Sequence, residues 1–229
     1  MTYMKKIVCL ANSRKTSGRC VAGRELTDNG IGPWVRPVSK RVTREISETD
    51  RRYQNGQRAS ILDIIEVPML ESAPHNHHTE DHLIDEDEYW VKTGEAGWET
   101  IEKMLESHNG PLWTSGNSTY HGVNDKVSEE IAATLDFSLL LIRPNDLNIL
   151  VRVESGFEGR PGKRRARARF NIDGESYLLQ ITDPKVEAEY LGRGDGTYAV
   201  DDAIVCLSLS EAWNGFVFKL VAAIFTPER

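Results

Sequence analysis

The segment with the clearest chemical pattern is Arg165-Ala166-Arg167-Ala168-Arg169-Phe170. Side chains alternate across a β-strand, so Arg165, Arg167 and Arg169 are predicted to share one face while the alanines and Phe170 face a core. Guanidinium groups bind phosphate oxygens in a bidentate manner, and a row of them suits a nucleic-acid backbone. The main alternative is an internal network of ion pairs with the acidic segments 71–88 or 183–202. Three further cations precede the row in the chain: Arg160, Lys163 and Arg164.

A second basic segment, residues 12–19, joins two predicted strands. Its small polar residues, backbone amides and cations could cradle a phosphate, although the P-loop pattern is missing. Downstream, the sequence GPWVRPV places an aromatic ring beside a cation, and aromatic rings can stack on bases. The alternative for the tryptophan is a place in the barrel core. The candidate phosphate-binding residues of these two segments are Asn12, Ser13, Arg14, Lys15, Arg19, Trp34 and Arg36.

A third cluster holds four of the six histidines. If the segment is helical, His78 and His82 lie one turn apart and could share a metal ion. However, the sequence HTEDH does not match the H-E-x-x-H motif, and no third ligand is evident. A solvated loop is therefore the favoured interpretation, and no metal or other cofactor is predicted. The weak candidates for a divalent-metal site are His75, His77, His78, Asp81 and His82.

Turns and apolar runs indicate the elements that would position these groups. Apolar runs at 7–11 and 59–67 and hairpin signals at Asn29-Gly30, Asp173-Gly174 and Asn214-Gly215 predict about ten strands. Two short helices are expected between them, one with Ser128 as its N-cap. Pro33 and Pro37 restrict their strand to an edge or an irregular position. Residues 68–90 are expected to be a surface excursion.

Two short echoes in the sequence raise the idea of a duplicated barrel. Residues 7–10 and 204–207 both read IVCL, and residues 35–37 resemble 142–144. The IVCL runs would also fit terminal strands that lie side by side. Helices do not alternate with strands, which disfavours a parallel α/β fold and favours mainly antiparallel β architecture.

The charge is unevenly distributed along a chain of 229 residues with a net charge of −7. Residues 1–58 carry 13 basic and 5 acidic residues, and residues 158–169 carry 6 basic residues and 1 acidic residue. Such patches can bind a charged partner even when the whole chain is acidic. Three cysteines without a CxxC pair and the lack of a long apolar run predict a cytoplasmic protein without a membrane partner.

Several motifs together resemble a family of bacterial proteins described as dual OB-containing domains. They are CLANSRKTSGRCVAGREL, GPWVRPVS, LDIIEVP, ITDP and CLSLSEAWNGFVFKLVAAIF. The resemblance spans most of the chain and implies two OB-like antiparallel barrels in one compact unit, with a small helical insert. OB barrels commonly bind oligonucleotides or oligosaccharides. No catalytic residue is carried over from this resemblance.

The chain is accordingly divided into residues 1–135, an N-terminal barrel with the acidic and helical insert, and residues 136–229, a C-terminal barrel. Strands shared between the barrels are compatible with this division. Familiar catalytic signatures are absent, so a binding module is favoured over an enzyme. The expected ligand is a nucleic acid or nucleotide, bound by the basic loop and by Lys163, Arg165, Arg167 and Arg169. The alternatives are a metal-dependent enzyme acting on such a ligand and an adaptor that binds a partner protein.

Overall fold

The computed structural model describes residues 2–114, 116–156 and 161–228, so Arg160 lies outside the described part of the chain. The chain forms two compact units. The first unit comprises Met1–Met104 and Asp136–Leu139, and the second comprises Leu105–Leu135 and Leu140–Arg229. Residues 105–135 thus pack with the second barrel, whereas the division made from the sequence assigned them to the first. No described helix is long and apolar enough to cross a membrane.

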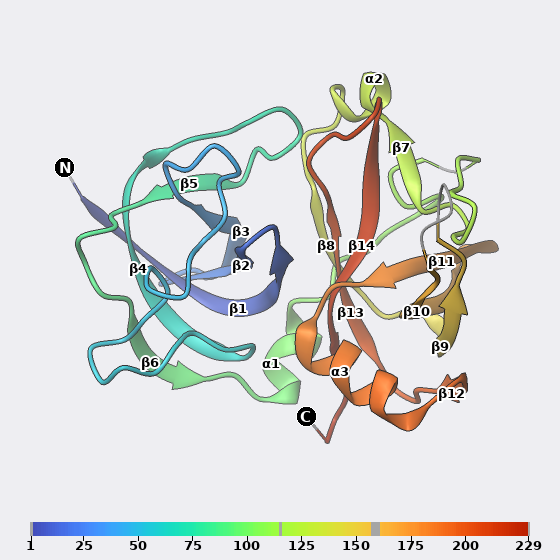
Figure 1. The fold of residues 1–229 in the computed structure, drawn as a ribbon. Coiled ribbons are helices and arrows are strands. Elements are labelled where there is room, and N and C mark those ends of the chain that lie inside the picture. Colours follow the sequence, from blue (N-terminus) through green and yellow to red (C-terminus); the bar gives the residue numbers. More distant parts are fainter. Residues whose placement is uncertain (1, 115, 157–160, 229) are drawn as a thin grey trace. The chain divides into compact units, whose positions relative to one another are not determined.

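The first unit is a closed five-stranded barrel with one added strand (Figure 1). Its strand order is β1-β2-β3-β5-β4, and β1 also pairs with β4, which closes the sheet. Strands β3 and β5 run parallel, and the other pairs are antiparallel. This is the Greek-key arrangement of an OB barrel. The elements are β1 (Tyr3–Lys15), β2 (Gly18–Thr27), β3 (Gly30–Val38), β4 (Asp63–Ser72), β5 (Asp81–Ile84), β6 (Val91–Glu95) and α1 (Trp98–Lys103).

The length of β1 makes the closure possible. Its first part, residues 3–8, pairs with β4, and residues 7–15 pair with β2, with a bulge between Cys9 and Ala11. A bulge bends a strand and increases its twist, which lets one strand serve both edges of the barrel. The inward side chains form a single apolar cluster that includes Ile7, Val35 and Trp90.

The second unit has the same topology built from other strands. The order β9-β10-β11-β14-β13 repeats the order of the first barrel, again with one parallel pair, β11 and β14. Strand β8 pairs with β13, and β9 pairs with β10. Together β8 and β9 therefore occupy the positions that the single long strand β1 occupies in the first barrel. The elements are β7 (Lys126–Ser128), α2 (Glu129–Ala132), β8 (Leu139–Ile142), β9 (Asn145–Glu154), β10 (Lys163–Ile172), β11 (Glu175–Ile181), α3 (Pro184–Arg193), β12 (Gly196–Ala199), β13 (Ile204–Leu209) and β14 (Phe216–Phe225).

The predicted hairpins are confirmed, and the described residues contain fourteen strands and three helices. Asp173 and Gly174 both have positive φ, as do Asn214 and Gly215, which is the conformation that two-residue hairpins require. Ser128 caps α2 as expected. Residues 143 and 144 connect β8 to β9, which are not neighbours in the sheet order.

The sheet order decides two expectations that the sequence left open. Of the two positions that Pro33 and Pro37 allow, an edge or an irregular one, β3 takes the irregular one, because it lies between β2 and β5 and its pairing with β2 shifts in register. Its prolines are tolerated because Pro33 falls within the irregular pairing between Trp34 and Ile31, and Pro37 follows Val35, the last residue paired with β2. The short sequence echoes also do not mark equivalent strands, since residues 204–207 lie in β13, which corresponds to β4, whereas residues 7–10 lie in β1, which corresponds to β8 and β9. Because β1 and β13 belong to different sheets, the two IVCL runs do not pair with each other either.

The segment 68–90 is not a solvated excursion. It contains the end of β4 and the whole of β5, and His77, His78 and Asp81 are buried. Strand β5 is short and polar, and its charged residue is balanced by arginines from elsewhere in the fold. Hydrophobic periodicity, the usual signal of a buried strand, is therefore absent.

A buried lysine marks the interior of the second unit. Lys219 in β14 is only 1% exposed, and its Nζ donates a hydrogen bond to the backbone oxygen of Thr114 and lies 5.3 Å from the centre of the Tyr177 ring. Burial lowers the pKa of Lys219 to about 8, although Asp125 and Glu175 act in the opposite direction. The folded protein therefore binds this proton less tightly than the unfolded chain does.

This difference predicts that the free energy of unfolding increases between about pH 8 and pH 10.5. Below pH 8 the lysine is protonated in both states, and its burial costs about 3 kcal/mol for a pKa lowered this far. Urea denaturation at a series of pH values measures the effect. Lys219→Met should remove the increase in this pH range, and an unchanged slope in that variant would contradict the assignment.

Candidate functional site

The arginine row occupies one face of β10, and β9 extends that face. Arg165 lies directly opposite Arg152 of β9, Arg167 opposite Leu150, and Arg169 opposite Asn148. Opposed residues of antiparallel strands project from the same side of the sheet. We call the surface formed by Arg152, Arg165, Arg167 and Arg169 the arginine face. Arg152 and Arg169 are exposed, Arg165 is half-buried, and Arg167 is buried.

Arg167 is held by two carboxylates and is 8% exposed. Its Nε donates to Oε1 of Glu154 at 2.5 Å, and its Nη2 donates to Oε2 of the same residue at 3.1 Å. Its Nη1 lies 3.7 Å from Oδ2 of Asp125. The middle member of the row therefore has a structural role, and its partners lie outside the acidic segments that were expected to supply them.

Asp125 fastens the segment 117–125 to the sheet. Its carboxylate accepts hydrogen bonds from the backbone N–H and the hydroxyl of Thr119, at 2.7 and 2.6 Å. Val123 exchanges two backbone hydrogen bonds with Leu178 of β11. Gly122 packs so closely that an added Cβ would stand 1.8 Å from Oδ2 of Asp125. This segment is thus tied to the sheet by side-chain and backbone contacts.

Arg152 provides a second contact between the sheet and the segment 117–125. Its Nη2 donates to the backbone oxygen of His121 at 3.4 Å, and Nε2 of His121 lies 3.2 Å from the backbone oxygen of Ser155. Tyr120 packs edge-on against the His121 ring, with 4.8 Å between centroids. The arginine face therefore has an exposed aromatic residue at its border.

The remaining cations of the face are available to a ligand. Among the described residues, Arg165, Arg169 and Lys163 form no ion pair, whereas Arg164, on the opposite side of β10, pairs with Asp195 at 2.8 Å. Two arginines directly opposite one another repel, and such a pair destabilises a sheet. The fold keeps Arg152 and Arg165 in this arrangement, which favours a role in binding an anion.

The basic segment 12–19 forms the β1–β2 hairpin of the first unit. Arg14 at its end is exposed and Lys15 is half-buried. Other groups have partners inside the unit: Nδ2 of Asn12 donates to the backbone oxygen of Ala59, and Nε of Arg19 donates to Glu48 at 3.3 Å. Ser13 is buried. The exposed end of this hairpin is the part that a ligand could reach.

Arg36 is buried, with an exposure of 2%. Its guanidinium group lies 2.8 Å from Glu80 and 3.3 Å from Asp81, and Nη2 also donates to the hydroxyl of Ser138 at 2.6 Å. Burial raises the pKa of Asp81 to about 6, against the opposing effect of the arginines. Trp34 is half-buried, with its ring 5.7 Å from the guanidinium carbon of Arg24. Neither residue presents the combined stacking and phosphate contact expected from the sequence.

The histidine cluster is not helical, so His78 and His82 do not lie on one helix face. His75 and His78 close a tight turn by two backbone hydrogen bonds, and His82 belongs to β5, where its Nδ1 lies 2.6 Å from the hydroxyl of Tyr3. The rings of His77 and His78 pack edge to face at 4.2 Å. Within the described residues, no three His, Cys, Asp or Glu side chains form a group that could hold a metal ion.

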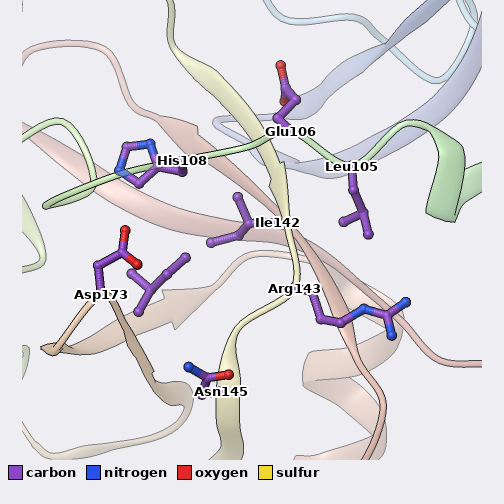
Figure 2. Close-up of a pocket in the computed structure, with 8 residues that line it drawn as sticks. Leu105, Glu106, His108, Ile142, Arg143, Asn145 and Asp173 are labelled. Atoms are coloured by element: carbon purple, nitrogen blue, oxygen red, sulfur yellow. The ribbon is translucent and has the colours of Figure 1, made fainter.

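A small pocket of about 260 Å³ lies in the second unit, apart from the arginine face. Figure 2 shows its polar side chains arranged around Ile142. Two of its carboxylates bind backbone amides, since Glu106 accepts from Leu141 and Asp173 accepts from Gly110. The volume suits a small molecule rather than a polymer. The lining residues are Leu105, Glu106, His108, Ile142, Arg143, Asn145, Ile172 and Asp173.

The arginine face was only partly foreseen from the sequence. The alternation of arginine and alanine identified β10, but Arg152, Tyr120 and the carboxylates of Asp125 and Glu154 were missed. A signal for Arg152 was present, because the end of NILVRVE, Val151-Arg152-Val153-Glu154, alternates apolar and polar residues and places the arginine on the polar side. Nothing local in the chain indicated that Tyr120 would lie beside it.

The buried position of Arg167 predicts a large loss of stability when its charge is removed. Arg167→Gln leaves Glu154 and Asp125 without their cation, and we expect the free energy of unfolding to fall by about 3–5 kcal/mol. Denaturant unfolding measures this change. The matched control is Arg164→Gln in the same strand, which breaks an exposed ion pair and should change stability by less than about 1 kcal/mol. Equal losses in the two variants would contradict the structural role of Arg167.

The close approach at Gly122 gives a second prediction. Gly122→Ala forces the Asp125 carboxylate to move and should destabilise the second unit by about 1–3 kcal/mol, as overpacking does elsewhere. Gly192 in α3 is the control, because an added Cβ there meets nothing within 4 Å. Gly192→Ala should stabilise by up to about 1 kcal/mol through helix propensity. Thermal unfolding of both variants checks the opposite signs.

Comparison with known proteins identifies the family to which the chain belongs. The model of the family described as "Dual OB-containing domain" matches residues 5–224. Neither a curated protein nor a solved structure matches the chain. The match covers nearly the whole sequence and agrees with the two barrels of like topology, mostly β in content. OB domains commonly bind nucleic acids. The chain therefore belongs to the dual OB-containing domain family.

Proposed function

We propose that the second barrel binds nucleic acid along the arginine face. The observation that carries the proposal is the directly opposed pair Arg152 and Arg165, which has no neutralising carboxylate among its described contacts. The repulsion between these two arginines destabilises the unliganded sheet, and a polyanion that lies over both guanidinium groups would relieve it. Arg169 continues the same face toward the other end of β10.

The dimensions of the face fit a phosphate backbone. Arg165 and Arg169 are four residues apart in one strand, which is about 13 Å at ~3.3 Å per residue. This distance corresponds to roughly four stacked nucleotides at ~3.4 Å each. Several phosphates can thus contact the face at once, and each contact releases counterions. Because the contacts are to phosphates, binding should depend little on base sequence and should weaken as the salt concentration rises.

Arg167 supports the site without contacting the ligand, because its side chain is buried. Its positive charge reduces the repulsion between the phosphates and the carboxylates of Glu154 and Asp125, and its contact with Asp125 helps to fix the segment 117–125 beside the face. The exposed end of the β1–β2 hairpin, with Arg14 and Lys15, is proposed as a secondary phosphate contact of the first unit. The end of this hairpin consists of small polar and basic residues, and its backbone turns tightly at Thr16, where φ is 46°.

Fluorescence polarisation with labelled DNA and RNA oligonucleotides at a series of salt concentrations tests the proposal. The wild-type protein should bind more weakly as salt rises, with a linear log–log dependence. In Arg152→Gln/Arg165→Gln/Arg169→Gln we expect a slope that is smaller by about 2, since three contacts are lost at ~0.7 each for single strands. Affinity at low salt should fall at least tenfold.

The control is Arg164→Gln, which changes the net charge from the opposite side of β10. It should keep the wild-type salt slope. The proposal is wrong if the wild-type protein binds no oligonucleotide at low salt, or if the triple variant, shown to be folded by circular dichroism, binds as the wild type does.

A further inference from the structure

Tyr120 has an exposure that its surroundings do not explain. Its side chain is 89% exposed, the highest value of any described aromatic residue. A tyrosine ring is large and mostly apolar, so leaving it in water forgoes the stabilisation that burial would bring. Tyrosine is enriched at binding interfaces relative to the rest of a protein surface.

The residues on both sides of Tyr120 are anchored to the arginine face. Thr119 binds the Asp125 carboxylate through its backbone N–H and its hydroxyl, and Asp125 lies beside Arg167. His121 is held by Arg152 through its backbone oxygen and by Ser155 through its ring. Tyr120 is therefore the exposed residue between two anchored ones, and the edge contact with His121 limits the freedom of its ring.

An anchored aromatic ring next to a row of cations has a specific use. Aromatic side chains stack on nucleobases whatever the base, because every base offers a flat π-face, while cations track the backbone. In a duplex both faces of an internal base are covered by its neighbours and its Watson–Crick edge is paired. Only an unpaired base can turn out and stack on the ring.

We propose that Tyr120 stacks on an unpaired base of the nucleic acid whose phosphates lie on the arginine face, which makes the ligand single-stranded. The inference rests on the proposed function and narrows it from nucleic acid in general to strands with accessible bases. Arg152 connects the two parts, since it faces Arg165 on the sheet and holds the backbone next to Tyr120. The ring is already positioned before binding, so little additional ordering is needed.

The experiment compares three labelled probes of equal length: a mixed-sequence single strand, the same strand in a duplex, and a strand of abasic nucleotides. We expect Tyr120→Ala to weaken binding of the single strand by roughly 5- to 100-fold, the range seen for base-stacking aromatics. Tyr120→Phe, which keeps the ring, should bind within about twofold of the wild type. The abasic strand should bind the wild type and Tyr120→Ala equally, because the stacking partner is gone.

The control for removing an exposed tyrosine is Tyr89→Ala in the first unit, where Tyr89 packs against Arg52. It should bind the single strand as the wild type does. The inference fails if Tyr120→Ala binds normally, or if it weakens the single, duplex and abasic probes equally. In either case the salt dependence and its loss in the arginine variant would stand, so the proposed function is tested separately. If the wild-type protein shows no salt-dependent binding, both the proposed function and the stacking role of Tyr120 are wrong.

Discussion

The ion-pair cluster of Arg167, Glu154 and Asp125 is the interaction on which the second unit depends most. A buried guanidinium is tolerated only when its charge and its donors are satisfied, and these two carboxylates supply both. The cluster joins β9, β10 and the segment 117–125. Nothing in the local sequences of these three parts indicates that they contact one another. It cancels the positive charge at the centre of the arginine face, whereas Arg165 and Arg169 on either side remain half-buried and exposed.

The first unit uses a comparable device. Arg36 of β3 is buried between Glu80 and Asp81, and its hydrogen bond to Ser138 brings a segment from the middle of the chain into the unit. Each barrel therefore contains a buried arginine, Arg36 or Arg167, that is held by two carboxylates and has a structural role. These carboxylates come from neighbouring strands or loops.

This division of labour separates stability from binding within one row of identical residues. Three arginines at alternating positions of β10 are equivalent in sequence, but one holds the fold and two face the solvent. The like-charged contact between Arg165 and Arg152 carries a cost in the unliganded protein, and the segment fixed by Arg167 presents Tyr120 beside that contact. The proposed mode of binding combines backbone contacts with a flat surface for a base, which are the two parts of single-strand recognition.

The sequence by itself determined the β-rich class, the hairpin at Asp173-Gly174, the cap at Ser128 and the shared face of the arginines, because each depends on neighbouring residues and on the period of a strand. The strand β5 and the buried state of His78 were not predictable, since their polar sequences resemble a loop. The burial of Arg36 was not predictable because its partners Glu80 and Asp81 lie far along the chain. Only the tertiary structure decided which arginine would be buried and which aromatic would stand beside it. The physical reason is that charge burial depends on carboxylates brought from distant positions in the chain, and such pairings leave no periodic trace in the sequence.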